Sequence, residues 1–348
     1  MAQLTYFERM HKKTPTRTWI NSVVQVEIEN ALRYGAVGIT TNPSMLPKAV
    51  TMDYRIWEPV LKELLNKKPN ASNEDIADGL NKGIAQRNAK LVFSIFKASK
   101  AENGYAAIQS NPLRNDELTT LTGTAREYSK IGENVLPKIP STATGERAVE
   151  ELTVEGINTI ATMGFSVSQV LAMSAAYERG LRGQRKKPRG YVVIIPGIFV
   201  DYLVDVMEKE AIKVAPEVIG AAGLFLARRV YEVAREHECK ADLIVGGTRK
   251  TYDVTGFVGR KLTVTHSFNT WVDLMVENPR IISSIGERPL KSAISELEEK
   301  FPDFRKAYEV DGLKTMEFRD FGPCVRFNGA CQKGYSEVVA KIESMRHA

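Results

Sequence analysis

Short apolar segments rich in β-branched residues alternate with longer amphipathic segments along most of this 348-residue chain. Such alternation is typical of βα units, in which helices cover a parallel sheet. The candidate strands are 17–21, 36–41, 105–109, 134–139, 157–162, 191–196, 242–246 and 261–265. Eight strands with intervening helices are the number that closes a (β/α)8 barrel, also called a TIM barrel. We therefore expect an α/β protein of this class.

An open doubly wound sheet is the alternative arrangement of the same units. No glycine-rich dinucleotide fingerprint follows any of the candidate strands, which weakens that alternative. Amphipathic spacing predicts helices over 22–34 and 145–155. Residues 44–103 exceed a single βα unit and should hold several helices. Beyond about 280 we expect C-terminal helices that pack on the barrel, the last over 334–345.

The chain shows no internal repeat, low-complexity segment or Pro/Gly/Ser linker that would divide it. A barrel of this length is routinely one domain. We therefore expect residues 1–348 to form a single barrel domain with its C-terminal helices. The N-terminus lacks the apolar core of a signal peptide, and no run of about 18 apolar residues follows. These features predict a soluble, cytoplasmic protein with no membrane partner.

Charge and cysteine content narrow the class of function. The net charge of +6 suits an anionic substrate. The one dense basic cluster, residues 182–189, has no interleaved aromatic residues to stack on bases, so we interpret it as a solvated loop and expect no nucleic-acid partner. Cys239, Cys324 and Cys331 are too few and too unevenly spaced for a disulfide framework or a zinc site.

Polar residues at the ends of the candidate strands are the informative ones, because catalytic residues of a barrel gather at the C-terminal ends of its strands. They are Asn21, Thr41, Asn42, Gln109, Asn111, Lys138, Thr162, Thr248 and Arg249. No carboxylate is among them.

Lys138 is distinguished by its apolar flanks, Val135-Leu136 before it and Ile139-Pro140 after it. A lysine inside a barrel loses the hydration of its ammonium group, so its pKa should fall toward neutrality. The neutral amine can then attack a carbonyl carbon and form an imine. The alternative is an interior lysine paired with a carboxylate, and position alone leaves both interpretations open.

Two long motifs resemble those of a known family. Residues 38–44 (Gly-Ile-Thr-Thr-Asn-Pro-Ser) resemble the GVTTNPS signature of transaldolases. Residues 134–140 (Asn-Val-Leu-Pro-Lys-Ile-Pro), followed by Thr144-Gly145 and by 155–158, resemble the NVxxKIPxTxxG…EGINxxxT segment of the same family. Phe301–Arg305 and Phe321–Pro323 resemble the C-terminal segment of a larger, divergent transaldolase group.

This resemblance implies a (β/α)8 barrel with the class I aldolase mechanism, which uses no metal and no cofactor. The lysine of the KIP motif, Lys138, would form a Schiff base with a ketose donor. Cleavage of the C3–C4 bond then leaves an enamine, which an aldehyde acceptor captures. The implied partner is a small ketose or related carbonyl compound, phosphorylated or not, and a homo-oligomer is compatible with it.

The other family roles carry over with departures. The aspartate that shuttles a proton at the end of the first strand is replaced by Asn21, and the glutamate that holds the catalytic water by Gln109. An amide can hold a hydroxyl or a water but cannot take its proton. Thr162, which holds the same water, and Asn42, which contacts the ketose, are retained. Thr41 and Ser166 complete the predicted substrate and catalytic set.

Another base is conceivable, either Tyr252 or His266. The phosphate end also departs from the family, because Phe199 stands where an arginine is usual after the sixth strand. The second phosphate arginine is retained as Arg249. A Gly-Phe-Val-Gly-Arg string at 256–260 precedes the eighth strand, and we interpret its likeness to the missing motif as coincidence.

The leading hypothesis is thus a Schiff-base aldolase or transaldolase that makes or breaks a C–C bond of a small ketose through Lys138. The alternative is a non-catalytic or repurposed barrel that binds a sugar-like ligand or a partner, which the amides at Asn21 and Gln109 would suit.

Overall fold

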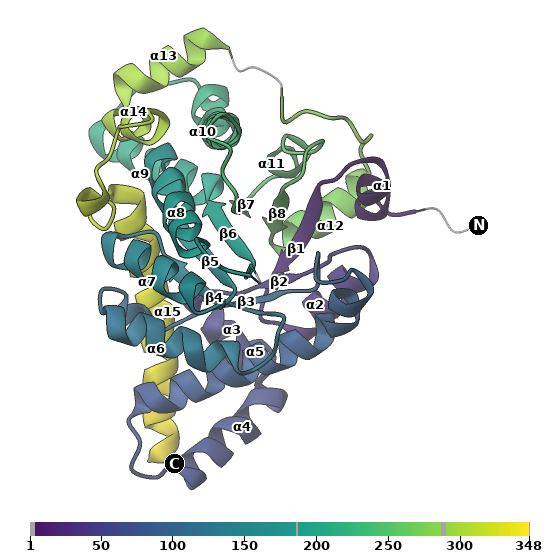
Figure 1. The fold of residues 1–348 in the computed structure, drawn as a ribbon, viewed down its shortest axis with the longest axis vertical. Helices are drawn as coiled ribbons and strands as arrows, with labels where there is room; N and C mark the ends of the chain where they lie inside the picture. Colours follow the sequence, from purple (N-terminus) through teal and green to yellow (C-terminus); the bar gives the residue numbers. More distant parts are fainter. Residues whose placement is uncertain (1–3, 186, 287–289, 348) are drawn as a thin grey trace.

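The computed structural model describes residues 4–185, 187–286 and 290–347, and within them eight parallel strands close into a barrel (Figure 1). Neighbouring strands follow chain order, and β1 pairs with β8 to close the ring. The strands are β1 Arg17–Asn21, β2 Ile39–Thr40, β3 Ala106–Gln109, β4 Val135–Pro140, β5 Thr159–Gly164, β6 Gly190–Ile194, β7 Asp242–Thr248 and β8 Thr263–His266. Each overlaps one predicted strand, so the (β/α)8 prediction is confirmed. The closed ring of strands excludes the alternative, an open doubly wound sheet.

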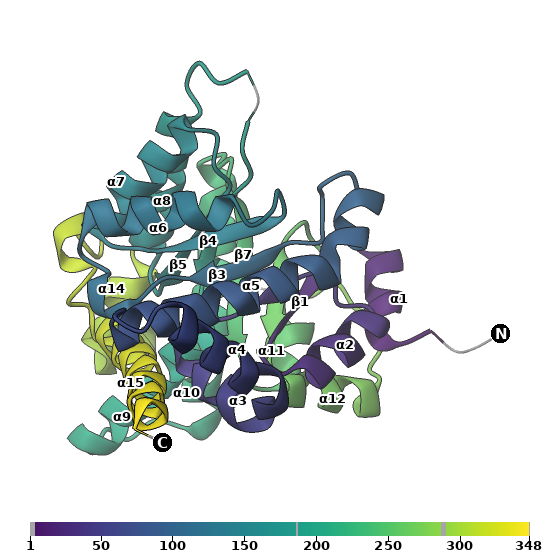
Figure 2. The same cartoon turned by 90° about the horizontal axis from the view of Figure 1, so that it is seen from below.

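Helices surround the barrel and extend one side of it (Figures 1 and 2). They are α1 Tyr6–Lys13, α2 Gln25–Arg33, η1 Pro43–Met45, α3 Leu46–Met52, α4 Tyr54–Lys67, α5 Asn73–Ala98, η2 Pro112–Arg114, α6 Leu118–Ser129, α7 Ala143–Val154, α8 Val167–Gly180, α9 Pro196–Glu210, α10 Pro216–Glu236, α11 Thr251–Thr255, α12 Phe268–Glu277, α13 Lys291–Lys300, α14 Pro302–Tyr308, η3 Thr315–Glu317 and α15 Gly322–Arg346. The stretch 44–103 holds several helices, as predicted.

The last helix, α15, begins well before the predicted boundary at residue 334, and this boundary was wrong. Pro323 occupies its first turn, where proline is well tolerated, and Phe321 precedes it in extended conformation. Gly329 and Gly334 inside the helix weaken the helical signal in the sequence. The glycine at 334 serves packing, because a Cβ there would lie 2.7 Å from the Cα of Ser44.

Aromatic side chains fill the N-terminal half of the barrel. The rings of Trp19 and Tyr191 lie 5.4 Å apart between centroids, and those of Tyr105 and Tyr191 lie 5.9 Å apart. Gly38 leaves room for this layer, since a Cβ at this position would come within 2.6 Å of the Trp19 indole. This aromatic layer closes the N-terminal end of the barrel to water, and the open space lies toward the C-terminal ends of the strands.

The C-terminal helix α15 packs against η1, α3, α5 and α9, on the side where the strands end. In Figure 1 it runs from the barrel toward α4. A second apolar cluster, which includes Trp57, Leu80 and Val338, lies between α15 and the helices of the 44–103 stretch. The C-terminal segment therefore builds part of the end of the barrel at which the strands terminate. That residues 1–348 form one domain stays a prediction.

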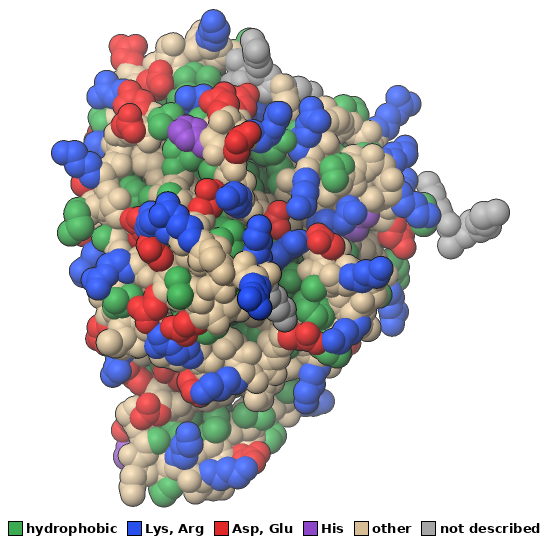
Figure 3. Space-filling model, in the orientation of Figure 1, with side chains coloured by type: hydrophobic (Ala, Val, Ile, Leu, Met, Phe, Trp, Pro, Cys, Tyr) green, Lys and Arg blue, Asp and Glu red, His purple; other side chains and the backbone are tan. Residues whose placement is uncertain are grey.

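The basic cluster at 182–189 forms the loop between α8 and β6, as predicted, except that Lys186 lies outside the described residues. On the face shown in Figure 3, basic and acidic side chains are interspersed. Arg189 makes ion pairs with Glu102 at 2.8 Å and with Asp242 at 3.2 Å. Nowhere in the described ranges does a helix have the length and apolar character needed to cross a bilayer.

The end of β4 is held by a close approach of α7. A Cβ at Gly145 would lie 1.7 Å from the carbonyl oxygen of Pro140, two residues beyond Lys138. We expect Gly145→Ala to lower the free energy of unfolding by about 1–3 kcal/mol, since the helix must move away from the strand. Gly123→Ala is the matched control: nothing lies within 4 Å of its Cβ, so alanine should stabilise α6 by about 0.5–1 kcal/mol. Thermal unfolding of both variants checks the difference, and a Gly145→Ala variant as stable as the wild type contradicts this account of the strand end.

Candidate active site

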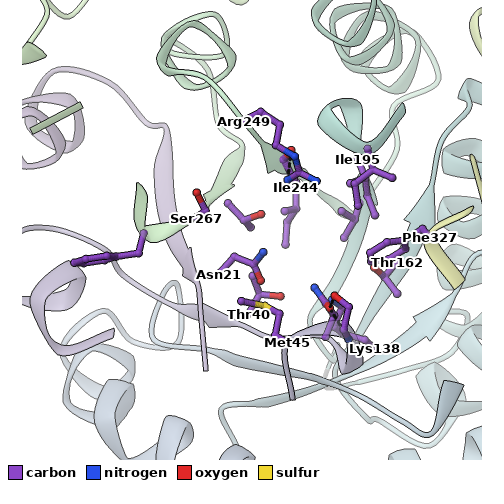
Figure 4. A pocket seen from close by; sticks show the side chains of 18 of the residues that line it. Asn21, Thr40, Met45, Lys138, Thr162, Ile195, Ile244, Arg249, Ser267 and Phe327 are labelled. Carbon is purple, nitrogen blue, oxygen red and sulfur yellow. Dashed lines mark hydrogen bonds between the residues drawn. The ribbon is translucent and has the colours of Figure 1, made fainter. Parts of the chain in front are cut away.

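A pocket of about 250 Å³ opens at the C-terminal ends of the strands. Figure 4 shows Lys138 and Thr162 on one side of it and Asn21 and Ser267 on the other, with Arg249 at the top of the view. The residues that line it are Asn21, Glu27, Thr40, Asn42, Ser44, Met45, Lys48, Lys138, Ile160, Thr162, Val193, Ile195, Ile198, Ile244, Gly246, Gly247, Arg249, Thr265, Ser267, Phe268, Asn269 and Phe327.

Lys138 points into the barrel because side chains alternate along β4. Its side chain is buried, and the Nζ atom donates a hydrogen bond to the carbonyl oxygen of Thr41 at 3.0 Å. Burial lowers the pKa of Lys138 from 10.5 to about 8, and the nearby Cys331 opposes this shift weakly. A sizeable fraction of the amine is thus neutral near physiological pH, which is the form that attacks a carbonyl carbon.

Gln109 lies beside Lys138, since the two residues are register partners on β3 and β4. Its side chain is 1% exposed, and neither Oε1 nor Nε2 has a hydrogen-bond partner among the described residues. Buried amides are ordinarily paired with protein or water. Gln109 does not itself line the pocket, but its unpaired amide is suited to hold a small polar molecule on the strand next to that of Lys138.

Thr162 lines the pocket from β5, directly before an irregularity of the strand. The register with β6 shifts between Ala161 and Gly164, and Met163 has a φ of 63°, which L-residues rarely adopt. Gln169 holds this segment, because its Nε2 atom donates to the Met163 carbonyl at 3.2 Å. The bulge fixes the direction of the Thr162 side chain.

Asn42, at the entrance to η1, presents an amide to the pocket. Its Oδ1 atom accepts hydrogen bonds from the backbone and hydroxyl of Ser44 at 3.1 and 2.5 Å, whereas no such bond engages its Nδ2 atom among the described residues. Thr41 contributes its carbonyl to Lys138 rather than its side chain, whose hydroxyl donates to the Ala107 carbonyl. The neighbour Thr40 lines the pocket instead.

The sequence matches the Transaldolase/Fructose-6-phosphate aldolase family over residues 18–315. The chain belongs to this family. Among curated relatives, a transaldolase 2 from Nostoc sp. is 31% identical over 158 residues, 44% of this chain and 41% of that protein. A transaldolase from Campylobacter jejuni is 30% identical over 168 residues, 48% of this chain and 50% of that protein.

The chain thus spans about half the length of the curated relatives it matches. Family membership supports an enzyme of the aldolase or transaldolase type.

Two predicted residues lie differently from the simple expectation for strand ends. Ser166 is fully buried and caps α8, where its hydroxyl accepts a hydrogen bond from the backbone of Gln169. It is not part of the pocket lining. Phe199, which the sequence resemblance places where the family usually has a phosphate arginine, is buried in the core, and its ring centroid lies 6.2 Å from that of Phe304. Ile195 and Ile198 line the pocket on that side.

Arg249 lines the pocket after β7 and is 45% exposed. Its guanidinium contacts Asp201 at 3.1 Å and the Gly247 carbonyl at 3.2 Å. Lys48 on α3 lines the same pocket. With Lys138, the lining carries three cationic groups, which favours an anionic substrate group at the mouth.

The candidate replacement bases lie outside the pocket. His266 projects from the outer side of β8 and stacks on Phe7 with centroids 5.0 Å apart, and burial lowers its pKa to about 4. Tyr252 is 48% exposed on α11. The string at 256–260 leads into the N-terminal end of β8, opposite the pocket, so its resemblance to a phosphate motif is coincidental.

Among the lining residues that sequence reasoning missed are Glu27, Lys48, Ser267 and Phe327. Glu27 and Ser267 lie at helix N-termini, which face the same end of the barrel as the strand ends. Their position at the start of the helix that follows a strand was the sequence signal by which Glu27 and Ser267 could have been predicted. Phe327 comes from α15 and had no such signal. Across the described ranges, no three His, Cys, Asp or Glu side chains are grouped as metal ligands would be.

The burial of Lys138 should be measurable as a dependence of stability on pH. Below pH 8 the folded state buries a charged ammonium group, and this burial lowers the free energy of unfolding by its full amount. Between pH 8 and 10.5 the folded state has lost the proton while the unfolded chain keeps it, so the wild type gains stability as pH rises. Relative to Lys138→Met, the wild type should gain roughly 2–3 kcal/mol between pH 7 and 10. Urea unfolding of both proteins at the two pH values gives this difference. The exposed Lys130→Met is the control, and an equal difference for both variants would show that the pKa of Lys138 is ordinary.

Proposed function

We propose that this protein is a class I aldolase or transaldolase that makes or breaks a C–C bond of a small ketose through an imine on Lys138. The observation that carries the proposal is the buried amine of Lys138, which lies in a pocket at the strand ends and forms no ion pair with a carboxylate of the described residues. Burial lowers the pKa of this amine to about 8. Family membership supports the same reaction class.

Imine formation can be followed through the residues around the amine. The neutral Lys138 attacks the ketose carbonyl, and the resulting carbinolamine loses water. Gln109, with an unpaired buried amide, and Thr162 lie on the strands either side of Lys138 and can hold that water. The protonated imine then accepts the electron pair of the C3–C4 bond and becomes an enamine. Asn21 and Asn42 offer amides to the hydroxyl groups of the sugar.

The substrate end far from the imine is proposed to carry a phosphate or similar anion. Lys48 and Arg249 supply positive charge there, while Phe199 supplies none. The guanidinium of Arg249 also forms an ion pair with Asp201, so fewer of its N–H groups are available to an anion. Anion binding is thus weaker than with two free arginines. We further propose that the enzyme works in the cytoplasm, without a metal or cofactor.

The amides at Asn21 and Gln109 favour a second candidate, a repurposed barrel that binds a sugar-like ligand without turnover. The two proposals differ at Lys138, because a binding protein needs no covalent intermediate.

Borohydride reduction in the presence of dihydroxyacetone should trap one adduct on Lys138. The imine is formed only by a neutral, accessible amine, and reduction makes it permanent. Intact mass followed by peptide mapping measures the adduct. Lys48→Met is the control for the second lysine of the pocket and should still be labelled, whereas Lys138→Met should not. A wild-type protein without an adduct at Lys138 rules out the covalent proposal and favours the binding protein.

The anion site should respond to Arg249→Met in a substrate-dependent way. Loss of a half-exposed charged hydrogen bond should raise KM for fructose 6-phosphate about 10-fold with little change in kcat. KM for fructose, which has no phosphate, should stay the same. Arg326→Met is the matched control, since Arg326 also lies near Asp201, at 3.8 Å, but does not line the pocket. Equal effects on both sugars would place the phosphate elsewhere.

A further inference from the structure

We propose that Glu27 supplies the acid–base carboxylate of the reaction, in place of the strand-end carboxylate that Asn21 replaces. This inference rests on the proposed function. Glu27 is the one carboxylate among the residues that line the pocket, all of which are described. It comes from the first turn of α2, the helix that follows β1, and so shares the pocket wall with Asn21.

The Glu27 carboxylate is held in place at one oxygen and open at the other. The hydroxyl of Ser22 donates a hydrogen bond to Oε2 at 2.5 Å and itself accepts one from the backbone of Val24 at 3.0 Å. Oε1 has no hydrogen-bond partner among the described residues. One oxygen therefore remains for a substrate hydroxyl or for a water that bridges to it.

The turn that carries Glu27 is anchored from the opposite side. The backbone N–H of Gln25 donates to Asp53 at 2.7 Å, and Arg87 bonds both Asp53, at 3.3 Å, and the carbonyl of Val23, at 2.7 Å. These contacts fix the start of α2 relative to the barrel. Because the Asp53 charge is matched by Arg87, the charged groups that face Glu27 across the pocket are cationic: Lys48, Lys138 and Arg249.

Glu27 does not act as a counter-ion for Lys138. Burial lowers the pKa of Lys138, and no carboxylate raises it. The carboxylate is therefore left to act on the C4 hydroxyl of the sugar, directly or through one water.

In cleavage, the proton of the C4 hydroxyl passes to the Glu27 carboxylate. The C3–C4 bond breaks, its electron pair enters the protonated imine to give the enamine, and C4 leaves as an aldehyde. In the reverse direction, the addition reaction, the aldehyde carbon bonds to C3 of the enamine, and the Glu27 carboxyl returns its proton to the new C4 oxygen. Imine formation from dihydroxyacetone has no C4 hydroxyl and does not need this step.

The experiment compares the full-length wild type with Glu27→Gln in two assays. One measures cleavage of fructose 6-phosphate and fructose, together with addition of dihydroxyacetone to glyceraldehyde 3-phosphate. The other measures the borohydride adduct of dihydroxyacetone on Lys138. We expect Glu27→Gln to lose 100-fold or more in kcat, as for loss of an acid–base group, and to keep the adduct. Glu29→Gln, on the exposed side of the same helix, is the control and should keep both activities.

Rescue separates a catalytic role from a structural one. Adding Asn21→Asp to Glu27→Gln places a carboxylate at the strand end and should restore at least 10-fold of the lost rate. Formate should likewise restore part of the rate of Glu27→Ala. A structural role for Glu27 would respond to neither.

The outcomes distinguish the inference from the function on which it rests. A wild type that forms no adduct, or forms one without making or breaking a C–C bond, overturns the proposed function and the Glu27 step together. A wild type that turns over while Glu27→Gln matches Glu29→Gln overturns the Glu27 step alone. Loss of rate without rescue by Asn21→Asp or formate also overturns it.

Discussion

The catalytic end of this barrel depends on one unfavourable burial, that of the Lys138 ammonium group. A buried charge is stable only if it is paired or if it gives up its proton. The partner of Nζ is the Thr41 carbonyl, a dipole and not an anion. The amine therefore loses its proton more readily, and its pKa falls to about 8. The fraction of neutral amine near physiological pH is thus a direct consequence of where β4 places this side chain.

The surrounding structure keeps that burial in place. The aromatic layer of Trp19, Tyr105 and Tyr191 closes the barrel below the site. The close approach of α7 at Gly145 fixes the end of β4, and α15 covers the pocket from the side with Phe327. A lysine at the same position on a looser strand end would reach water and keep its ordinary pKa. The low pKa therefore reflects the packing of the whole catalytic end.

The strands, the barrel and the burial of Lys138 could be predicted because each depends on local pattern: β-branched segments, regular alternation and a lysine with apolar flanks. The positions of Ser166 and Phe199 could not be predicted in this way. Whether a side chain near a strand end faces the pocket or the core depends on bulges and helix entry angles, such as the irregular segment around Met163. Glu27 and Phe327 were missed because they come from a helix start and from a distant C-terminal helix, which no strand-end pattern marks.

The amides at Asn21 and Gln109 and the low pKa of Lys138 are physically linked. A carboxylate within about 4–6 Å of the amine would stabilise the ammonium form and raise its pKa by one unit or more. With amides at both positions, burial is the main cause of the lowered pKa, and a sizeable fraction of the amine is neutral near physiological pH. The proposed proton acceptor, Glu27, is not among the groups that shift the pKa of the amine. The anchored first turn of α2 carries this carboxylate. In the proposed mechanism the base thus stands at a helix start and not at the strand end, where Asn21 is an amide, and it is separated from the nucleophile Lys138.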